Sequence, residues 1–218
     1  MVKVNLGCGP SGIEGWLNYD WGILPLLSKF TGFRKWLVGL GLLPRDYDIG
    51  WPKLRLWDIR WRLPLKNNSV DFIYCSHVLE HVEYWQSKNI LKECRRVLKR
   101  NGVLRIVLPD MGLIVKKYFS DGPMNRTAEC LRQKEFNMNV FGVDRSKFND
   151  GFLSKLQKFF IREHRWMYDE KDMVFLLKKA GFRKIKKCSF RKGKMADIDK
   201  LDLKIHKELS MYFEVEKI

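Results

Sequence analysis

The chain has 218 residues, of which 45% are hydrophobic and 31% are charged. A chain of this length and composition can bury one sizeable core, so we expect a single domain over residues 1–218. The formal net charge of +17 exceeds what solubility requires and predicts attraction to polyanions, either nucleic acid or an acidic lipid surface. Charge alone does not choose between these partners.

The cysteines and the apolar segments exclude several classes of protein. The five cysteines are odd in number and include no Cys-x-x-Cys pair, so we predict a reducing compartment and no metal site. The start of the chain lacks the pattern of a secretory signal peptide. Lys29, Arg34 and Lys35 interrupt the longest apolar stretch, whereas a bilayer span needs about 20 nearly uncharged residues. We therefore expect a cytoplasmic protein without a transmembrane segment.

The first part of the chain predicts three strands. Residues 2–6 form a short apolar run that leads into a glycine-rich turn at residues 7–12, as expected of a buried strand and the turn that follows it. Residues 17–20 and 54–59 predict the second and third strands. Between these two strands, residues 21–50 are rich in Leu, Trp and Phe, and we interpret them as a variable insertion or lid.

The middle of the chain predicts a strand, a helix and a further strand. Residues 70–75 predict the fourth strand, and apolar residues at helical spacing predict a helix over residues 83–99. Asn101-Gly102 is typical of a helix C-terminus. Residues 103–108 then predict the fifth strand.

The remaining residues complete an alternating pattern. We interpret residues 111–170 as the acceptor-side segment, with a helix near residues 124–141. A helix is expected over residues 170–180, stopped by Gly181, and strands are expected over residues 183–190 and 211–216. Strands that alternate with helices predict a doubly wound α/β fold around a mostly parallel sheet.

The turn after the first strand carries the first chemical signal. Gly7-Cys8-Gly9 lets a nucleoside cofactor approach the backbone, because glycine has no Cβ and tolerates unusual backbone angles. A plain tight turn explains the same residues. Gly12 completes a Gly-x-Gly-x-x-Gly spacing that nicotinamide-dependent dehydrogenases use, but Pro10 and Gly15-Trp16 stand where that motif should enter a long helix.

Four downstream motifs occur in a fixed order. The sequence contains Trp57-Asp58-Ile59, then Leu63-Pro64-Leu65, then Ser69-Val70-Asp71-Phe72-Ile73, then Ser76-His77-Val78-Leu79-Glu80-His81. With the Gly-Cys-Gly turn, they resemble the class I S-adenosylmethionine-dependent methyltransferases of the type 11 group. The resemblance implies a Rossmann-like, seven-stranded sheet with an antiparallel last strand, and S-adenosylmethionine as the cofactor.

The resemblance also implies which residues bind that cofactor. The turn would pack against it, Asp20 would accept hydrogen bonds from the ribose hydroxyls, and Asp58 and Ile59 would meet the adenine. The positions concerned are Gly7, Cys8, Gly9, Pro10, Asp20, Asp58 and Ile59. Ser76 and His77 follow the fourth strand at the carboxyl edge of the sheet, where open α/β folds bind ligands, so we expect them to contact the cofactor or the acceptor instead of the core. Too few residues separate Gly9 from Asp20 for a full helix, so either that helix is lost or Asp20 is misplaced. A strand-end cap is the structural alternative for Asp58.

Methyl transfer needs a general base only when the acceptor must lose a proton. For a hydroxyl acceptor the candidate catalytic residues are Asp110, after the fifth strand, and His164, in a basic and aromatic run. A surface or helix-capping histidine is the alternative for His164. Glu80 and His81 are also of the acid–base type, but the family resemblance implies a structural role for them, in which they tie the helix start to the cofactor turn.

The sequence leaves several classes of methyl acceptor possible. The segments Asn5–Pro10 and Gly15–Asp20 resemble compact methyltransferases of polysaccharide biosynthesis, which implies a hydroxyl of a glycan or other small molecule. The basic charge and the aromatic residues among arginines at positions 57–62 instead favour RNA. A catalytically silent scaffold that still binds S-adenosylmethionine is a third alternative. Peripheral membrane contact is also predicted, with Lys29, Arg34 and Lys35 facing lipid headgroups.

Overall fold

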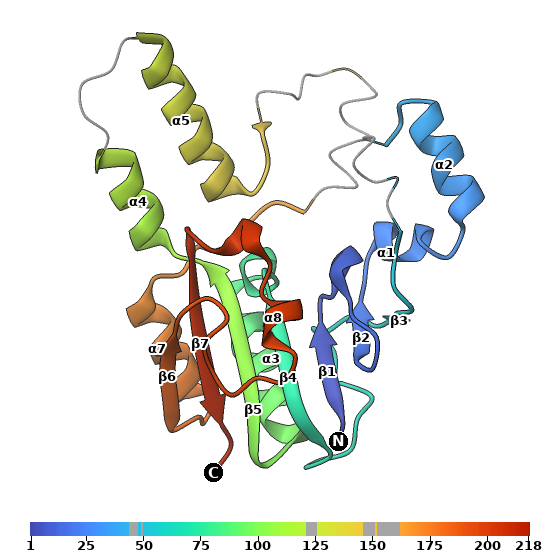
Figure 1. Ribbon diagram of the computed structural model, residues 1–218, viewed down its shortest axis with the longest axis vertical. Helices are drawn as coiled ribbons and strands as arrows, with labels where there is room; N and C mark the ends of the chain where they lie inside the picture. The colour runs from blue at the N-terminus through green and yellow to red at the C-terminus, as the bar shows by residue number, and fades with distance from the viewer. Residues whose placement is uncertain (44–47, 49, 121–125, 146–150, 152–161) are drawn as a thin grey trace.

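The alternating strands and helices assemble around one seven-stranded sheet in the order β3-β2-β1-β4-β5-β7-β6 (Figure 1). The computed structural model describes residues 1–43, 48, 50–120, 126–145, 151 and 162–218. The strands are β1 (Lys3–Leu6), β2 (Leu17–Asp20), β3 (Arg55–Leu56), β4 (Val70–Ser76), β5 (Leu98–Pro109), β6 (Lys184–Cys188) and β7 (Ser210–Glu216). Only β7 runs antiparallel to its neighbours. The predicted fold class is therefore confirmed.

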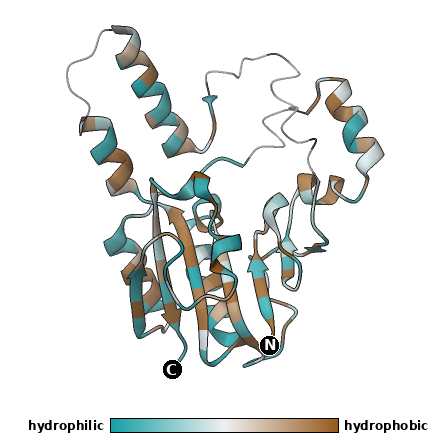
Figure 2. Cartoon of the chain, in the orientation of Figure 1, coloured by the Kyte–Doolittle hydropathy of each residue, from teal (hydrophilic) through white to brown (hydrophobic). Residues whose placement is uncertain are grey.

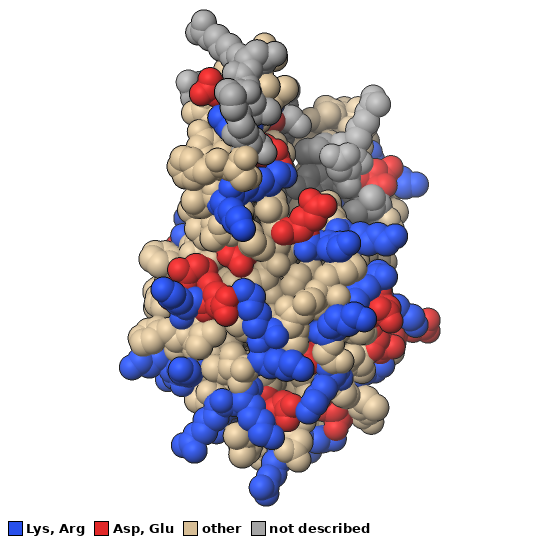
Figure 3. All heavy atoms as spheres, turned by 60° about the vertical axis from the view of Figure 1, so that its left-hand side comes forward, with Lys and Arg blue, Asp and Glu red and all other residues tan. Residues whose placement is uncertain are grey.

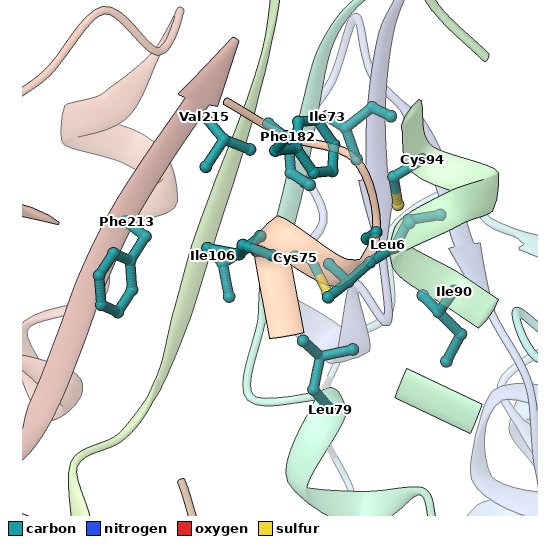
Figure 4. Packing of buried hydrophobic residues seen from close by; sticks show 14 of the residues in the cluster. Leu6, Ile73, Cys75, Leu79, Ile90, Cys94, Ile106, Phe182, Phe213 and Val215 are labelled. Atoms are coloured by element: carbon teal, nitrogen blue, oxygen red, sulfur yellow. The ribbon is translucent and has the colours of Figure 1, made fainter. Parts of the chain in front are cut away.

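The central strands β1 and β4 present hydrophobic side chains to one face of the sheet, because successive side chains of a strand point to opposite faces. Val4 pairs with Ile73 and Leu6 with Cys75, and all four side chains are at most 2% exposed. Figure 2 shows the apolar residues gathered along these strands. Figure 4 shows how Leu6, Ile73 and Cys75 pack with residues of the covering helices.

Helices α3 (Tyr84–Val97) and α7 (Glu170–Lys179) cover one face of the sheet. Helix α3 begins with a capping box between Glu83 and Gln86, which satisfies backbone N–H groups at its first turn. The predicted end of this helix at Asn101-Gly102 is wrong. The helix ends at Val97 because the fully buried Leu98 turns extended and pairs with Val70 in the sheet.

On the other face of the sheet, a buried ionic cluster links β5 to the segment between β6 and β7. Helix α8 (Ile198–Leu201) lies there, and the single turn η5 (Lys204–His206) follows it in the chain. The guanidinium of Arg105 on β5 is fully buried, 2.6 Å from a carboxylate oxygen of Asp202 and 3.0 Å from one of Glu214. It also donates to the backbone oxygens of Ser189 and Lys192. The segment between β6 and β7 is thus tied to the middle of the sheet.

Four further helices stand beyond the carboxyl ends of the strands (Figure 1). They are α1 (Ile23–Leu27), α2 (Thr31–Gly39), α4 (Met111–Ser120) and α5 (Arg126–Phe141). Helix α5 corresponds to the helix predicted near residues 124–141, although residue 124 lies outside the described chain. Helix α4 was not predicted, and the third strand is shorter than expected. Helix α4 follows the end of β5, and β3 is the edge strand of the sheet. At both places, strand pairing constrains the backbone less than it does in the middle of the sheet.

The insertion at residues 21–50 buries a small apolar cluster of its own, formed by Leu27, Leu37 and Leu43. Arg34 is only 4% exposed, and one of its nitrogens lies 3.8 Å from a carboxylate oxygen of Asp48. The expectation that Arg34 faces lipid headgroups is therefore wrong, because its side chain is enclosed within the insertion. Residues 44–47 and 49 of this segment lie outside the described chain. Within the described residues, no helix combines the length and apolar character needed to cross a membrane.

Candidate active site

A pocket of about 650 Å³ opens at the carboxyl ends of β1, β2 and β4. Strand order reverses at β1, which lies between β2 and β4, and open α/β sheets bind ligands at such a switch point. The lining residues come from the strand ends, the start of α3 and the segment before α7. They are Gly7, Gly9, Asp20, Trp21, Trp57, Asp58, Ile59, Arg60, His77, Val78, His81, Val82, Glu83, Gln86, Arg162, Glu163 and Arg165.

The glycine turn forms the floor of this pocket. Gly7 has a φ of +64°, and a Cβ there would lie 2.3 Å from Cγ2 of Val78, so only glycine fits. Gly9 has a φ of +52°, but a Cβ at that position would meet no described atom within 4 Å. The backbone at Gly9 therefore opens into the pocket, as close approach of a ligand requires.

Asp20 closes the same side of the pocket. Its Oδ2 accepts a hydrogen bond of 2.7 Å from the N–H of Gly9, and its Oδ1 accepts one of 2.7 Å from the N–H of Trp21. Burial raises the pKa of Asp20 despite these hydrogen bonds. The expected helix after Gly9 is reduced to one 3-10 turn, η1 (Gly9–Ser11). The short spacing left two alternatives, a lost helix or a misplaced Asp20. The structure shows that the helix is lost and that Asp20 lines the pocket.

Asp58 and Ile59 also line the pocket. Both side chains are less than 10% exposed, and the Asp58 carboxylate accepts hydrogen bonds from both the backbone and the guanidinium of Arg60. Burial alone would raise the pKa of Asp58, but the hydrogen bonds and charge of Arg60 outweigh it and lower that pKa. Asp58 is thus an ionised acceptor with its orientation fixed by Arg60.

The other predicted cofactor residues divide into two groups. His77 lines the pocket with a φ of +53°. Cys8, Pro10 and Ser76 belong to the same turns but are not among the described residues that line it. Cys8 is buried, and burial raises the pKa of its thiol to about 12. Its side chain is therefore an uncharged packing group.

The two candidate catalytic residues lie in different places. Asp110 is 6% exposed, accepts hydrogen bonds from the N–H groups of Gly112 and Leu113 at the start of α4, and lines a separate groove beside α7. His164 packs edge-on against His81, with ring centroids 4.9 Å apart. Burial lowers the pKa of His164, which favours its neutral form. The structure thus brings His164, but not Asp110, next to a pocket residue.

All four histidines of the chain gather at this edge of the sheet. The rings of His77 and His206 stack with centroids 3.6 Å apart, and His81 contacts His164. Glu80 lies among them with no exposed surface, and its Oε1 is 3.1 Å from Nδ1 of His77. Burial acts to raise the pKa of Glu80, but the neighbouring His77 and His81 outweigh it and lower that pKa. The sequence did not predict this cluster, because its members are far apart along the chain.

Several other pocket residues were missed as well. Arg60, Arg162 and Arg165 bring positive charge to the pocket wall, and Arg162 donates a hydrogen bond to the backbone oxygen of Trp21. The N–H groups of Arg165 and Trp166 both bond to the backbone oxygen of Glu80. The basic and aromatic run around His164 was the only signal in the sequence that this segment belongs to the site.

Comparison with known proteins relates both the sequence and the fold of this chain to methyltransferases. Residues 45–106 match the family model described as a methyltransferase domain. An uncharacterized protein of Methanocaldococcus jannaschii is 40% identical over 140 residues, which cover 54% of this chain and 60% of that protein. This chain therefore spans less than two thirds of that relative.

Solved structures of three S-adenosylmethionine-dependent methyltransferases superimpose on nearly the whole chain, each with a TM-score of 0.50. The Thermotoga maritima protein is 16% identical, with 100% of this chain and 82% of that chain covered. The Methanosarcina mazei protein is 18% identical, with 99% and 92% covered. The Archaeoglobus fulgidus protein is 13% identical, with 99% and 85% covered. The chain thus has the Rossmann-like fold of these methyltransferases, and its residues 45–106 match the methyltransferase-domain model.

Proposed function

We propose that this protein transfers a methyl group from S-adenosylmethionine to a hydroxyl of a glycan or another small molecule. The observation that carries the proposal is the pocket at the switch point of the sheet. Gly7, Asp20, Asp58 and Ile59 line it together, although the sequence separates them by up to 52 positions. These are residues that the family resemblance assigns to the cofactor.

The residues present fit that cofactor. The pocket volume of about 650 Å³ lies within the ~300–1,000 Å³ range of small-molecule sites. The backbone at Gly9 leaves room for a ligand, the Asp20 carboxylate suits a ribose diol, and Asp58 with Ile59 suits an aminopurine ring. When bound, S-adenosylmethionine would supply an activated methyl group on its sulfonium. The chain's own task is then to align the acceptor and exclude water.

The rest of the pocket wall suits a polar acceptor. Arg60, Arg162 and Arg165 offer hydrogen-bond donors, and Glu83 and Glu163 offer acceptors. A sugar presents both donors and acceptors in its hydroxyl groups, so this mixed wall can orient it. The resemblance to methyltransferases of polysaccharide biosynthesis supports the same class of acceptor.

RNA remains the alternative acceptor because of the charge of +17. On the face shown in Figure 3, lysines and arginines predominate, but acidic residues and neutral surface interrupt them. RNA-binding proteins that track a phosphate backbone use a continuous basic groove. This face therefore does not present a continuous basic groove of that kind.

Isothermal titration of the purified chain with S-adenosylmethionine and S-adenosylhomocysteine tests the cofactor, with NADH as the control. We expect binding of both sulfur compounds and none of NADH. Labelled methyl transfer is then measured separately to a mixture of oligosaccharides and to total RNA. Transfer to RNA alone would replace the glycan proposal, and binding without transfer to any acceptor would indicate a silent scaffold. Absence of binding by folded protein would overturn the proposal.

A further inference from the structure

Glu80, His81 and His164 form a compact group of metal-ligand types beside the pocket. Each offers one ligand atom, and these three atoms all lie within 4.8 Å of one another. Glu80 and His81 belong to the single turn η3 (Leu79–His81), whereas His164 comes from the segment before α7. The tertiary fold therefore builds this group from two distant parts of the chain.

Both histidines are held in the form that a metal ion requires. Nδ1 of His81 lies 3.2 Å from the backbone oxygen of Glu163, and Nδ1 of His164 lies 3.1 Å from the backbone oxygen of Val140. A carbonyl oxygen only accepts, so Nδ1 must donate in each ring and the lone pair is left on Nε2. Metal-binding histidines commonly donate their other ring N–H to a backbone carbonyl in this way.

Glu80 supplies the independent observation that points to a ligand. Its side chain has no exposed surface, and Nδ1 of His77 lies 3.1 Å from its Oε1. The second carboxylate oxygen, Oε2, accepts no hydrogen bond from the described parts of the chain. Burying a carboxylate in this way is costly unless a cation or donors compensate it, and a bound metal ion would do so.

We propose that Glu80, His81 and His164 bind one divalent transition-metal ion, with Zn²⁺ as the best match. Two imidazole nitrogens and one carboxylate oxygen are the donor set of catalytic zinc sites that keep an open coordination position. Magnesium prefers a shell of oxygens, so this donor set disfavours it. The expectation that the chain has no metal site is replaced by this proposal.

The chemical role of the ion rests on the proposed methyltransferase function. Because His81 lines the pocket, an acceptor bound there would lie beside the ion. Coordination would lower the pKa of the acceptor hydroxyl, so that its proton would pass to water. The oxygen would then form a bond to the methyl carbon as the bond from that carbon to the sulfonium sulfur breaks, which would release S-adenosylhomocysteine. His164 would thus act as a metal ligand instead of a general base.

Metal binding can be measured on the full chain without any methyl acceptor. The protein is treated with EDTA, dialysed and titrated with Zn²⁺ and with Mg²⁺ by calorimetry, and with Co²⁺ by visible absorption. We expect one Zn²⁺ per chain, weaker Mg²⁺ binding, and Co²⁺ absorption bands typical of nitrogen and oxygen ligands. His81→Gln and His164→Gln should each weaken Zn²⁺ binding about 100-fold or more, since even residues that only support a ligand contribute about 10–100-fold.

His206→Gln is the matched control, because His206 belongs to the same histidine cluster but is not one of the three ligands. It should bind Zn²⁺ like the unchanged protein. Equal weakening by His206→Gln and His164→Gln, or no Zn²⁺ binding by protein with an unchanged circular dichroism spectrum, would overturn the site. Zn²⁺ binding without S-adenosylmethionine binding would uphold the site and reject the proposed function. Full methyl transfer after EDTA treatment would overturn the role in catalysis.

Discussion

The carboxylate of Asp20 and the backbone N–H of Gly9 are joined by a hydrogen bond of 2.7 Å. Asp20 ends β2, whereas Gly9 follows β1, so this bond connects the glycine turn to the neighbouring strand. A second bond from the N–H of Trp21 fixes the other carboxylate oxygen. The side chain is thus held at the pocket wall before any ligand arrives, which reduces the ordering cost of binding.

Replacing Asp20 should weaken cofactor binding. Asp20→Asn keeps the size of the side chain but removes its charge and one acceptor oxygen. A hydrogen bond to a charged group contributes about 1.5–3 kcal/mol, so we expect calorimetry to show at least about 10-fold weaker binding of S-adenosylhomocysteine. Because burial raises the pKa of Asp20, acidification should weaken binding at a higher pH than for an ordinary aspartate. Glu14→Gln, at an exposed position of the same connection, is the control and should bind normally.

The two glycines of the turn should respond differently to alanine. Gly7→Ala adds a clash with Val78 to an unfavourable φ, and we expect urea unfolding to show a loss of about 2–4 kcal/mol. Gly9→Ala meets no described neighbour, so only the backbone penalty of about 1–2 kcal/mol applies. The double variant Gly7→Ala with Val78→Ala should recover part of the lost stability. Similar losses for the two single variants would contradict this account.

The buried guanidinium of Arg105 should be among the most sensitive positions for stability. Arg105→Met leaves the carboxylates of Asp202 and Glu214 without their buried cation. Breaking a buried ion pair in this way costs about 3–5 kcal/mol, measurable by urea unfolding. Lys194→Met removes an exposed ion pair with Glu216 and should cause no measurable change. A small effect of Arg105→Met would show that water compensates the two carboxylates.

His206 should make the protein sensitive to acid. Burial and the adjacent His77 lower its pKa from 6.5 to about 4, against the opposing charges of Glu80 and Asp202. The unfolded chain therefore binds the proton first, so this contribution to stability is complete above pH 6.5 and is lost as the pH falls toward about 4. His206→Gln should flatten the dependence of the unfolding free energy on pH across that window. An unchanged slope would show that other groups, such as His164, control it.

The predicted contact with a membrane surface can be tested at helix α2. Phe33 and Trp36 stack on each other, and both are more than 50% exposed. Exposed aromatic residues on a basic protein favour binding to anionic lipid. We therefore expect sedimentation with anionic but not neutral vesicles, reduced by Trp36→Ala. Trp85→Ala removes an equally exposed tryptophan from α3 and serves as the control. Absence of sedimentation with both vesicle types would remove this partner.

The sheet could largely be read from the sequence because local patterns specify its strands. Residues 70–75 have the largely apolar character of a buried strand, and the structure places β4 there; β2 likewise lies at the predicted residues 17–20. Gly181 stops α7 with a φ of +94°, as its position after an amphipathic helix predicted. The assignment of Gly7, Asp20 and Asp58 to the site followed from the family resemblance of the ordered motifs, and each lies at or near the end of a predicted strand.

The sequence by itself determined the fold class, most strand positions and the residues at the floor of the pocket, because strand and turn signals are local. Only the tertiary structure decided that His164 contacts His81 and lies beside Glu80, since 84 positions separate Glu80 from His164. It likewise decided that Arg34 is buried and that α3 ends at Val97. These features depend on burial and pairing between distant segments, which no local pattern of residues encodes.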